Sequence, residues 1–376
     1  MLKVMTIVGT RPELIKMARV IVKFDENTDH VLVHTGQNYD FELNQVFFDD
    51  LGIRRPDHFL EAAGKNAAQT IANVIAKVDD ILELEAPDAV MLYGDTNSCL
   101  AVIAAKRRKI PVFHMEAGNR CFDQRVPEEL NRKVVDHLSD INMVLTEHAR
   151  RYLLDEGIAP ERVIKTGSNM AEVLNFYKDK IENSSVLESL KLDADKYFLV
   201  SAHREENVDS DENLQEMVAT LNAIVDKYNY PVIVSTHPRT RKRLESLGLM
   251  DGSSKILFLK PFGFFDYIKL QIEATCVISD SGTITEETSL LGLKAITIRK
   301  THERPEGMDE GTVIMSGLGA ERVVQAIEFT IKDHISKGEG FGVVADYAVE
   351  NTSSKILKIV MSYVDFVNRT VWHKQT

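Results

Sequence analysis

The sequence predicts an α/β protein built from two Rossmann-like parallel-sheet domains that face each other across a cleft. Short apolar segments of strand length alternate with amphipathic stretches of about ten to fifteen residues, which is typical of βαβ units. The two halves of the chain show the same alternating architecture, but their residues do not repeat. At 376 residues the chain is too long for one ordinary core and fits two.

The first strand is expected at residues 3–8, and a complete helix start follows it. Thr10 can cap the helix, Pro12 occupies a position where a missing N–H costs nothing, and Glu13 closes a capping box. Apolar residues then recur at helical spacing to about Lys23. This segment therefore predicts the first strand-turn-helix unit of a parallel sheet.

The remaining elements follow in the same alternating order. In the first half we expect a strand at 31–35, a helix from about Phe41, a helix near 67–84, a strand at 88–93, a helix to Arg108, a strand at 111–115, and a strand, helix and short strand between 141 and 168. The charged, irregular stretch 177–196 is expected to cross into the second domain, whose strands are expected at 197–202, 231–236, 256–259, 276–279 and 295–298. Residues 353–369 form a final amphipathic helix.

The composition is that of an ordinary globular protein, with 44% apolar and 27% charged residues. The net charge of -12 argues against a nucleic-acid partner or an anionic membrane surface, although a phosphate site needs only a few local cations. No run reaches the roughly 18 apolar residues of a membrane span, and the N-terminus does not resemble a signal peptide. Cys99, Cys121 and Cys276 are widely separated, which indicates neither disulfides nor a thiolate metal site. These features predict a cytoplasmic protein.

Three carboxylates are expected at one edge of the first sheet. Asp95 follows the strand at 88–93, Glu116 follows the strand at 111–115, and Glu128 comes shortly after. Ligands of open α/β sheets bind at the carboxyl ends of the strands, and crowding of like charges there raises the pKa values of some of them. For any one carboxylate an N-cap or a salt bridge is the alternative interpretation. Together they predict an acid–base site.

The second half offers a candidate site for a pyrophosphate. Ser281 and Gly282 follow an expected strand and open a helix, and Thr283 with Glu286 can form a capping box. Free N–H groups and the helix dipole at such a start favour an anion. The alternative interpretation is a simple capped helix start. Because the segment lacks GxGxxG, NAD is a poor fit.

Further cations lie near expected strand ends. Arg11 and Lys16 stand near the open end of the first strand-turn-helix unit, where they suit an anion. His203 and Arg204 follow the first strand of the second half and are suited to contact a phosphate or a nucleobase; a solvated loop is the alternative. His302 has no second His at metal spacing, so we expect no zinc.

Six ordered motifs resemble the non-hydrolysing UDP-N-acetylglucosamine 2-epimerase family over essentially the whole chain. They are VGTRPELIK, GDTNS, HMEAGNR with PEELNR, HREEN, SDSGTITEE and HERPE. The resemblance implies a glycosyltransferase-B-like fold, a UDP-sugar substrate held mainly by the second domain, and a homodimer. It also implies a first domain of residues 1–169, with the C-terminal helix 354–376 packing back on it, and a second domain of residues 170–353.

The same resemblance implies roles for individual residues. Those that match UDP-binding groups are Arg11, Lys16, His203, Arg204, Ser281, Gly282 and Glu287. Those that match catalytic groups are Asp95, Glu116, Glu128 and His203. The implied reaction removes the C2 proton with loss of UDP, and then returns UDP and a proton to the opposite face of C2. It requires no metal, nicotinamide or other cofactor.

The chain departs from the glucosamine enzymes in the loop before PEE, where it reads NRCFDQRVPEE instead of LRTGD and a longer loop, and at Asn38, Thr283 and Thr285. This loop resembles the branch that converts UDP-2-acetamido-2,6-dideoxy-L-talose to UDP-N-acetyl-L-fucosamine for capsule or O-antigen synthesis. Phe122 and Val126 suit the methyl group of a 6-deoxy sugar. The alternatives are a UDP-N-acetylglucosamine 2-epimerase, a glycosyltransferase on the same fold and a UDP-sugar-binding sensor.

Overall fold

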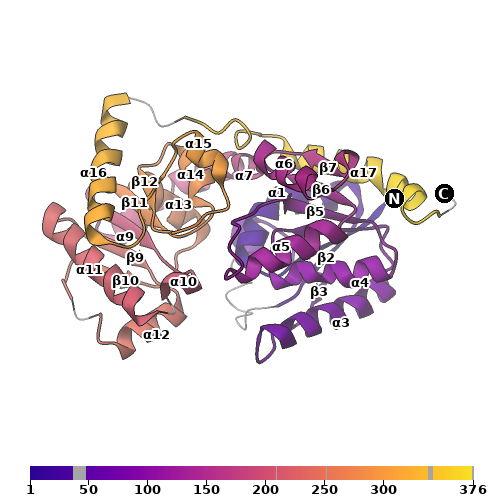
Figure 1. Ribbon diagram of the computed structural model, residues 1–376, viewed down its shortest axis with the longest axis horizontal. Helices are drawn as coiled ribbons and strands as arrows, with labels where there is room; N and C mark the ends of the chain where they lie inside the picture. The colour runs from indigo at the N-terminus through magenta and orange to yellow at the C-terminus, as the bar shows by residue number, and fades with distance from the viewer. Residues whose placement is uncertain (37–47, 209, 251, 338–341, 375–376) are drawn as a thin grey trace. The chain divides into compact units, whose positions relative to one another are not determined.

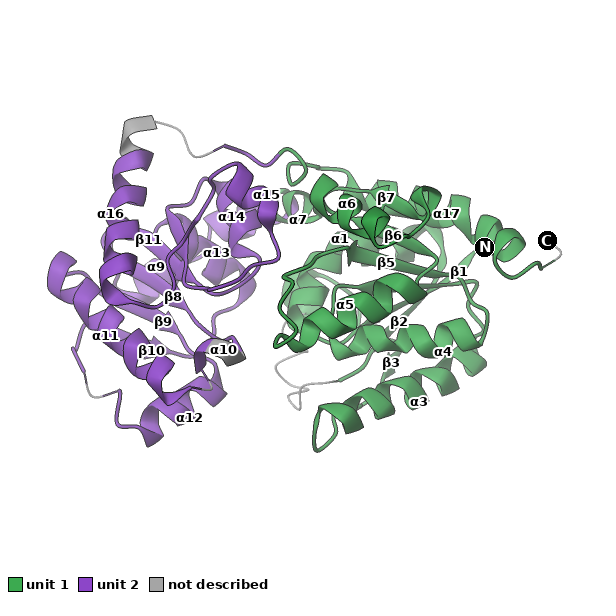
Figure 2. Ribbon diagram, in the orientation of Figure 1, with its two compact units in different colours: residues 1–175, 345–376 green, residues 176–344 purple. Residues whose placement is uncertain are grey.

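The computed structural model describes residues 1–36, 48–208, 210–250, 252–337 and 342–374 (Figure 1). The chain forms two compact units, which Figure 2 distinguishes by colour: residues 1–175 with 345–376 make unit 1, and residues 176–344 make unit 2. The helix predicted from about Phe41, and the motif residues Gln37 and Asn38, lie outside the described residues.

Unit 1 is built on a sheet of seven parallel strands within the described residues. In chain order they are β1 (Lys3–Val8), β2 (Asp29–His34), β3 (His58–Phe59), β4 (Ala89–Tyr93), β5 (Val112–Ala117), β6 (Ile141–Val144) and β7 (Val163–Lys165). Their order across the sheet is β3-β2-β1-β4-β5-β6-β7. The central strands are almost continuously buried, as expected when helices cover both faces of a parallel sheet.

The helices of unit 1 surround this sheet (Figure 1). They are α1 (Arg11–Asn27), α3 (Ala67–Glu85), the 3-10 helix η1 (Asn97–Ala101), α4 (Val102–Arg107), α5 (Pro127–Leu138), α6 (Glu147–Asp155), the 3-10 helix η2 (Pro160–Arg162), α7 (Met170–Phe176) and α17 (Thr352–Thr370). The C-terminal helix α17 packs against α1 of the same unit and buries its apolar face there. Of the described helices, none combines the length and the apolar character that crossing a bilayer would require.

Unit 2 repeats the architecture with six parallel strands in its described part, in the order β10-β9-β8-β11-β12-β13. The strands are β8 (Phe198–Ser201), β9 (Val232–Ser235), β10 (Ile256–Leu259), β11 (Cys276–Ser279), β12 (Ala295–Thr297) and β13 (Ile314–Met315). The helices are α8 (Lys178–Glu182), α9 (Val186–Leu190), α10 (Glu205–Val208), α11 (Asp211–Tyr228), α12 (Pro238–Ser246), α13 (Phe264–Ile272), α14 (Ile284–Leu291), α15 (Pro305–Asp309) and α16 (Ala320–Lys337).

The unit boundary lies a few residues from the predicted one, and the stretch 177–196 leads into unit 2, where it forms α8 and α9. Residues beyond 169 stay with unit 1 because Glu172 accepts a hydrogen bond from the backbone N–H of Ser353 at 2.8 Å. Where the chain returns to unit 1, Asp346 pairs with Lys165 of β7 at 2.7 Å. These contacts fix α7 and the approach to α17 to the first sheet.

Each sheet has a point at which the strand order reverses. In unit 1 the reversal lies between β1 and β4, and in unit 2 between β8 and β11. Ligands of open α/β sheets bind beyond the carboxyl ends of the strands at such a point. The loops that begin there are those at Gly9 and Gly94 in unit 1, and at Ala202 and Asp280 in unit 2.

Candidate active site

Two of the three predicted carboxylates stand at one edge of the unit 1 sheet. Asp95 follows β4, and Glu116 lies near the end of the neighbouring parallel strand β5. Glu116 has a φ of +59°, in the left-handed region that non-glycine residues rarely adopt, and the pairing register of β5 shifts between Met115 and Ala117. Such backbone strain is concentrated at functional sites, where the surrounding structure over-determines it.

Lys16 and Tyr93 hold the Glu116 carboxylate. Lys16 Nζ lies 2.6 Å from Glu116 Oε2, and the Tyr93 hydroxyl donates to the same oxygen at 2.5 Å. The side chains of Lys16 and Glu116 are 7% and 12% exposed, so this ion pair is largely shielded from water. Lys16, predicted to bind UDP, is therefore joined directly to a predicted catalytic carboxylate.

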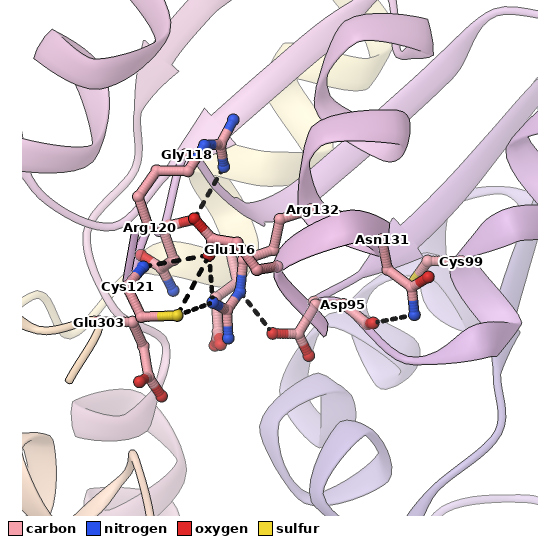
Figure 3. A network of polar contacts seen from close by, with 12 residues as sticks. Asp95, Cys99, Glu116, Gly118, Arg120, Cys121, Asn131, Arg132 and Glu303 are labelled. Atoms are coloured by element: carbon pink, nitrogen blue, oxygen red, sulfur yellow. Dashed lines mark hydrogen bonds and ion pairs between the residues drawn. The ribbon is translucent and has the colours of Figure 1, made fainter. Parts of the chain in front are cut away.

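Asp95 is held from α5. Arg132 Nε lies 2.8 Å from Asp95 Oδ2, and the Asn131 amide donates to the Asp95 carbonyl at 2.9 Å. Figure 3 shows Arg132 reaching from its helix to Asp95 on one side and to the Cys121 sulfur on the other. Arg132 also pairs with Glu129 at 2.8 Å, and the exposed fraction of Arg132 is 3%. The guanidinium thus fixes the position of the Asp95 side chain.

Glu128 and Glu129 are adjacent on α5 but differ in environment. Glu129 is buried and accepts the backbone N–H groups of Cys121 and Phe122, each at 3.1 Å. Glu128, in the first turn, is partly exposed. Burial raises the pKa of the Cys121 thiol. Of the two carboxylates, Glu128 is the one that is accessible to solvent.

Glu13 is a buried carboxyl that the sequence indicated only as part of a capping box. The capping box with Thr10 is present, and Glu13 Oε2 also accepts the Gly9 N–H at 2.6 Å. The Thr96 hydroxyl donates to Glu13 Oε1 at 2.5 Å, which ties the start of α1 to the residue after Asp95. Burial raises the pKa of Glu13 to about 7, and the charge of Asp95 adds to the increase.

The raised pKa of Glu13 predicts a pH-dependent stability. Between its ordinary pKa of 4.5 and about 7 the folded state keeps the proton that the unfolded state has lost, so rising pH favours unfolding across this window. A Glu13→Gln variant mimics the protonated form, so its free energy of unfolding lacks this pH dependence. For wild type, the free energy of unfolding should fall by roughly 3 kcal/mol from one end of the window to the other. We expect the melting midpoint of the variant to rise relative to wild type from about pH 4.5 to about pH 7.

The matched control is Glu26→Gln on the same helix, where the side chain is 57% exposed. Its melting midpoint should follow that of wild type at every pH. If the plots of melting midpoint against pH ran parallel for Glu13→Gln and wild type, the Glu13 carboxyl would titrate in its ordinary range.

In unit 2 a buried aspartate organises the loop after β8. The carboxylate of Asp280 is inaccessible to solvent and accepts the backbone N–H groups of His203 and Arg204 at 3.0 to 3.1 Å. The Asn207 amide donates to the same carboxylate at 2.9 Å. His203 Nδ1 lies 3.4 Å from Asp280, while 49% of the His203 side chain is exposed. Asp280 therefore presents His203 toward solvent at the reversal point of the sheet.

Gly282 stands close to a chain of ion pairs. Glu303 accepts from Arg204 Nη2 at 3.1 Å and from Arg299 Nη1 at 2.5 Å. A Cβ atom on Gly282 would collide with the Glu303 carboxylate, so only glycine brings the backbone this near. Ser281, which precedes Gly282, is partly exposed, and its hydroxyl lies 3.0 Å from that of Thr283.

The predicted capping box at this helix start is wrong. Thr283 makes no side-chain cap hydrogen bond, and its N–H is taken by the Ser281 hydroxyl at 3.3 Å. Glu286 instead pairs with Arg304 at 2.7 Å in a buried position, because a charge there needs a partner. Glu287 is buried and accepts from the Gln271 amide at 2.6 Å, which holds its carboxylate near the first turn of α14.

Several functional contacts escaped prediction. Tyr93, Asp280 and Glu303 lie far along the chain from the residues that they hold, so no local pattern links them. The pairing of Glu129 with Arg132 follows helical i,i+3 spacing and was readable in PEELNR.

The remaining predicted residue, Arg11, is the first residue of α1 and is partly exposed. In the part of the chain that the structure describes, no three His, Cys, Asp or Glu side chains are grouped to hold a metal ion.

The chain resembles known proteins along nearly its whole length. A family model described as UDP-N-acetylglucosamine 2-epimerase matches residues 21–361. The structure of a UDP-N-acetylglucosamine 2-epimerase from Rickettsia bellii is 59% identical, with both chains fully covered and a TM-score of 0.94. The Methanocaldococcus jannaschii UDP-GlcNAc 2-epimerase, in complex with UDP-GlcNAc and UDP, is 31% identical over 96% of this chain and 100% of its own, with a TM-score of 0.89.

A further relative shows that the likeness extends to other nucleotide sugars. The UDP-2,3-diacetamido-2,3-dideoxy-D-glucuronate 2-epimerase of Pseudomonas aeruginosa is 32% identical over 86% of this chain and 91% of its own. The predicted pair of glycosyltransferase-B-like parallel-sheet domains is confirmed by these matches. The chain belongs to the UDP-N-acetylglucosamine 2-epimerase family, as an isomerase of the UDP-sugar 2-epimerase type.

Proposed function

We propose that this protein converts UDP-2-acetamido-2,6-dideoxy-L-talose to UDP-N-acetyl-L-fucosamine by eliminating and re-adding UDP. The product would serve capsule or O-antigen synthesis, and the enzyme would act as a cytoplasmic homodimer. The observation that carries the reaction type is the pairing of Glu116 with Lys16 and Tyr93 beside Asp95 and Arg132, because it combines a proton-transfer group with a cation suited to a diphosphate.

Unit 2 supplies groups suited to UDP. The start of α14 at Ser281 and Gly282 offers backbone N–H groups and a favourable dipole for the diphosphate. Arg204, held by Glu303, adds a guanidinium, and Glu287 is positioned by Gln271 to accept from ribose hydroxyls. His203, exposed above Asp280, would contact the substrate near the reacting atoms.

Unit 1 supplies the proton chemistry. A carboxylate among Asp95, Glu116 and Glu128 takes the proton from C2, and the electron pair of the C2–H bond forms a C1–C2 double bond as the C1–O bond to UDP breaks. Addition of a proton to the opposite face of C2 and return of the UDP oxygen to C1 complete the epimerisation. No carbonyl acidifies this C2 proton, so the barrier falls only if the departing diphosphate is stabilised, a role that Arg11 and Lys16 suit. The reaction requires no cofactor.

The substrate proposal rests on the loop before α5. Of the two side chains that suit a methyl group, Phe122 is 71% exposed and Val126 is 6% exposed at the cap of α5. Phe122 has a φ of +56°, and its ring meets Tyr152 edge-on at 5.2 Å between centroids. Phe122 therefore offers an exposed apolar ring that would suit the methyl group of a 6-deoxy sugar, whereas Val126 is buried. The second candidate is UDP-N-acetylglucosamine, which the names of the relatives favour.

The experiment is deuterium exchange at C2 with each candidate sugar. The purified protein is incubated in D2O with UDP-2-acetamido-2,6-dideoxy-L-talose and, separately, with UDP-N-acetylglucosamine, without added metal or NAD. We expect loss of the C2 proton signal and a new epimer from the talose sugar only. Turnover of the glucosamine sugar alone would replace the substrate proposal by the second candidate. Exchange with neither would contradict the proposed function.

A further inference from the structure

A buried histidine lies directly behind the Asp95 loop. His114, in β5, has 1% of its side chain exposed. Its Nδ1 lies 2.9 Å from Asp136 Oδ1, and its Nε2 lies 2.7 Å from the carbonyl oxygen of Gly94. Gly94 directly precedes Asp95 and has a φ of +72°. One imidazole ring therefore links α5 to the turn that carries a proposed catalytic carboxylate.

Both ring nitrogens face acceptors. A backbone carbonyl cannot donate, and a neutral imidazole has only one N–H. The other oxygen of Asp136 accepts from Arg120 Nη1 at 2.7 Å and from the Gly118 N–H at 3.2 Å. Burial opposes ionisation of Asp136, yet the hydrogen bond from His114 and the charges of His114 and Arg120 lower the pKa of its carboxyl. Arg120 and the Gly118 N–H both donate to Asp136 Oδ2, as they would to a carboxylate anion. Such an anion has no hydrogen to give to Nδ1, so both nitrogens of His114 donate, one to Asp136 and one to the Gly94 carbonyl.

The surrounding charges balance this cation. Arg120, whose side chain is inaccessible, forms a bidentate pair with Glu156, with both N···O distances 2.8 Å. Two cations and two carboxylates therefore alternate as His114, Asp136, Arg120 and Glu156. The neighbours of His114 in the sheet are apolar Leu92 on β4 and neutral Asn142 on β6, whose amide donates to the Asp136 carbonyl at 2.9 Å. Asp136 is the charged group that these contacts bring directly to the ring.

We propose that His114 donates from both ring nitrogens, as an imidazolium, and clamps the Gly94 carbonyl so that Asp95 is positioned for the C2 reaction. It is a positioning residue, because it acts through Gly94 and touches no reacting atom. The clamp complements Arg132, which holds the Asp95 side chain. The effect on turnover rests on the proposed function, whereas the charge of the ring does not.

Two substitutions separate the two bonds of the ring. In His114→Gln the amide nitrogen occupies the place of Nε2 and keeps the bond to Gly94, whereas in His114→Asn it occupies the place of Nδ1 and keeps the bond to Asp136. Both variants lose the buried cation, so we expect similar losses of melting midpoint. We expect kcat for C2 exchange to be at least about tenfold lower in His114→Asn than in His114→Gln, with similar KM. Equal kcat losses would overturn the positioning role.

Nitrogen NMR of the histidine-labelled wild-type protein tests the charge independently of activity. At about pH 7.5, where a free histidine is mostly neutral, both ring nitrogens of His114 should give the signals of protonated nitrogens. The signal absent from His114→Gln assigns the residue. A pyridine-type nitrogen at His114 would overturn the proposal. Wild-type protein without C2 exchange would count against the proposed function, while the NMR result would still decide the state of His114.

Discussion

Replacing Glu116 by glutamine is expected to slow C2 deuterium exchange by about 10²- to 10⁴-fold, the range typical of a lost general acid or base. The amide preserves the size of the side chain but can neither take nor return a proton. Lys16 loses its anionic partner at 2.6 Å and becomes more available to the diphosphate. Affinity for UDP, measured by calorimetry, should therefore stay the same or increase.

The matching variants Asp95→Asn and Glu128→Gln should lose exchange to a similar extent. Glu26→Gln, on the exposed side of α1, serves again as the control and should exchange at the wild-type rate. Full activity in all three amide variants would remove the carboxylates from the mechanism. A loss of both exchange and UDP binding in Glu116→Gln would instead indicate that the Lys16–Glu116 pair maintains the fold of unit 1.

Replacing Gly282 by alanine is expected to weaken UDP binding by at least about tenfold. The added methyl group collides with the Glu303 carboxylate, which must move away from Arg204 and Arg299. Overpacking of this kind typically costs about 1 to 3 kcal/mol, and about 1.4 kcal/mol corresponds to a tenfold change in affinity. Calorimetric titration of UDP into the variant measures the effect.

Gly252→Ala is the matched control in the same unit. Its Cβ atom would meet the Asn222 side chain at 3.7 Å, an ordinary contact distance. This variant should bind UDP as wild type does. If Gly282→Ala folds and binds UDP with unchanged affinity, the start of α14 is not the diphosphate site.

The sequence predicted the alternation of strands and helices because the buried strands of a parallel sheet are continuous apolar runs. β1, β10 and β11 have the predicted bounds. It also placed Asp95 and Glu116 at one edge, since successive parallel strands end at the same side of the sheet. The two-residue strands β3 and β13 were missed, because so short a run has no periodicity to read.

The contacts that define the site depend on tertiary structure. Glu286 has the spacing of a capping residue, but Arg304 lies within reach of it in the folded chain and takes its carboxylate. The strained backbone of Glu116 leaves no mark in the sequence, since most left-handed positions are filled by glycine. His114 and Asp136 are on different elements, and only the pairing of β5 with its neighbours and the packing of α5 brings them together.

The most direct test of the mechanism follows the bond between C1 and the UDP oxygen. A substrate labelled with ¹⁸O at the bridging position is incubated with the wild-type protein, and phosphorus NMR follows the label. Elimination frees the β-phosphate to rotate, so we expect the label to spread to non-bridging positions while deuterium enters C2 from D2O. Deuterium at C2 with the label still wholly in the bridge would show that the C1–O bond does not break, and would contradict epimerisation by elimination and re-addition of UDP.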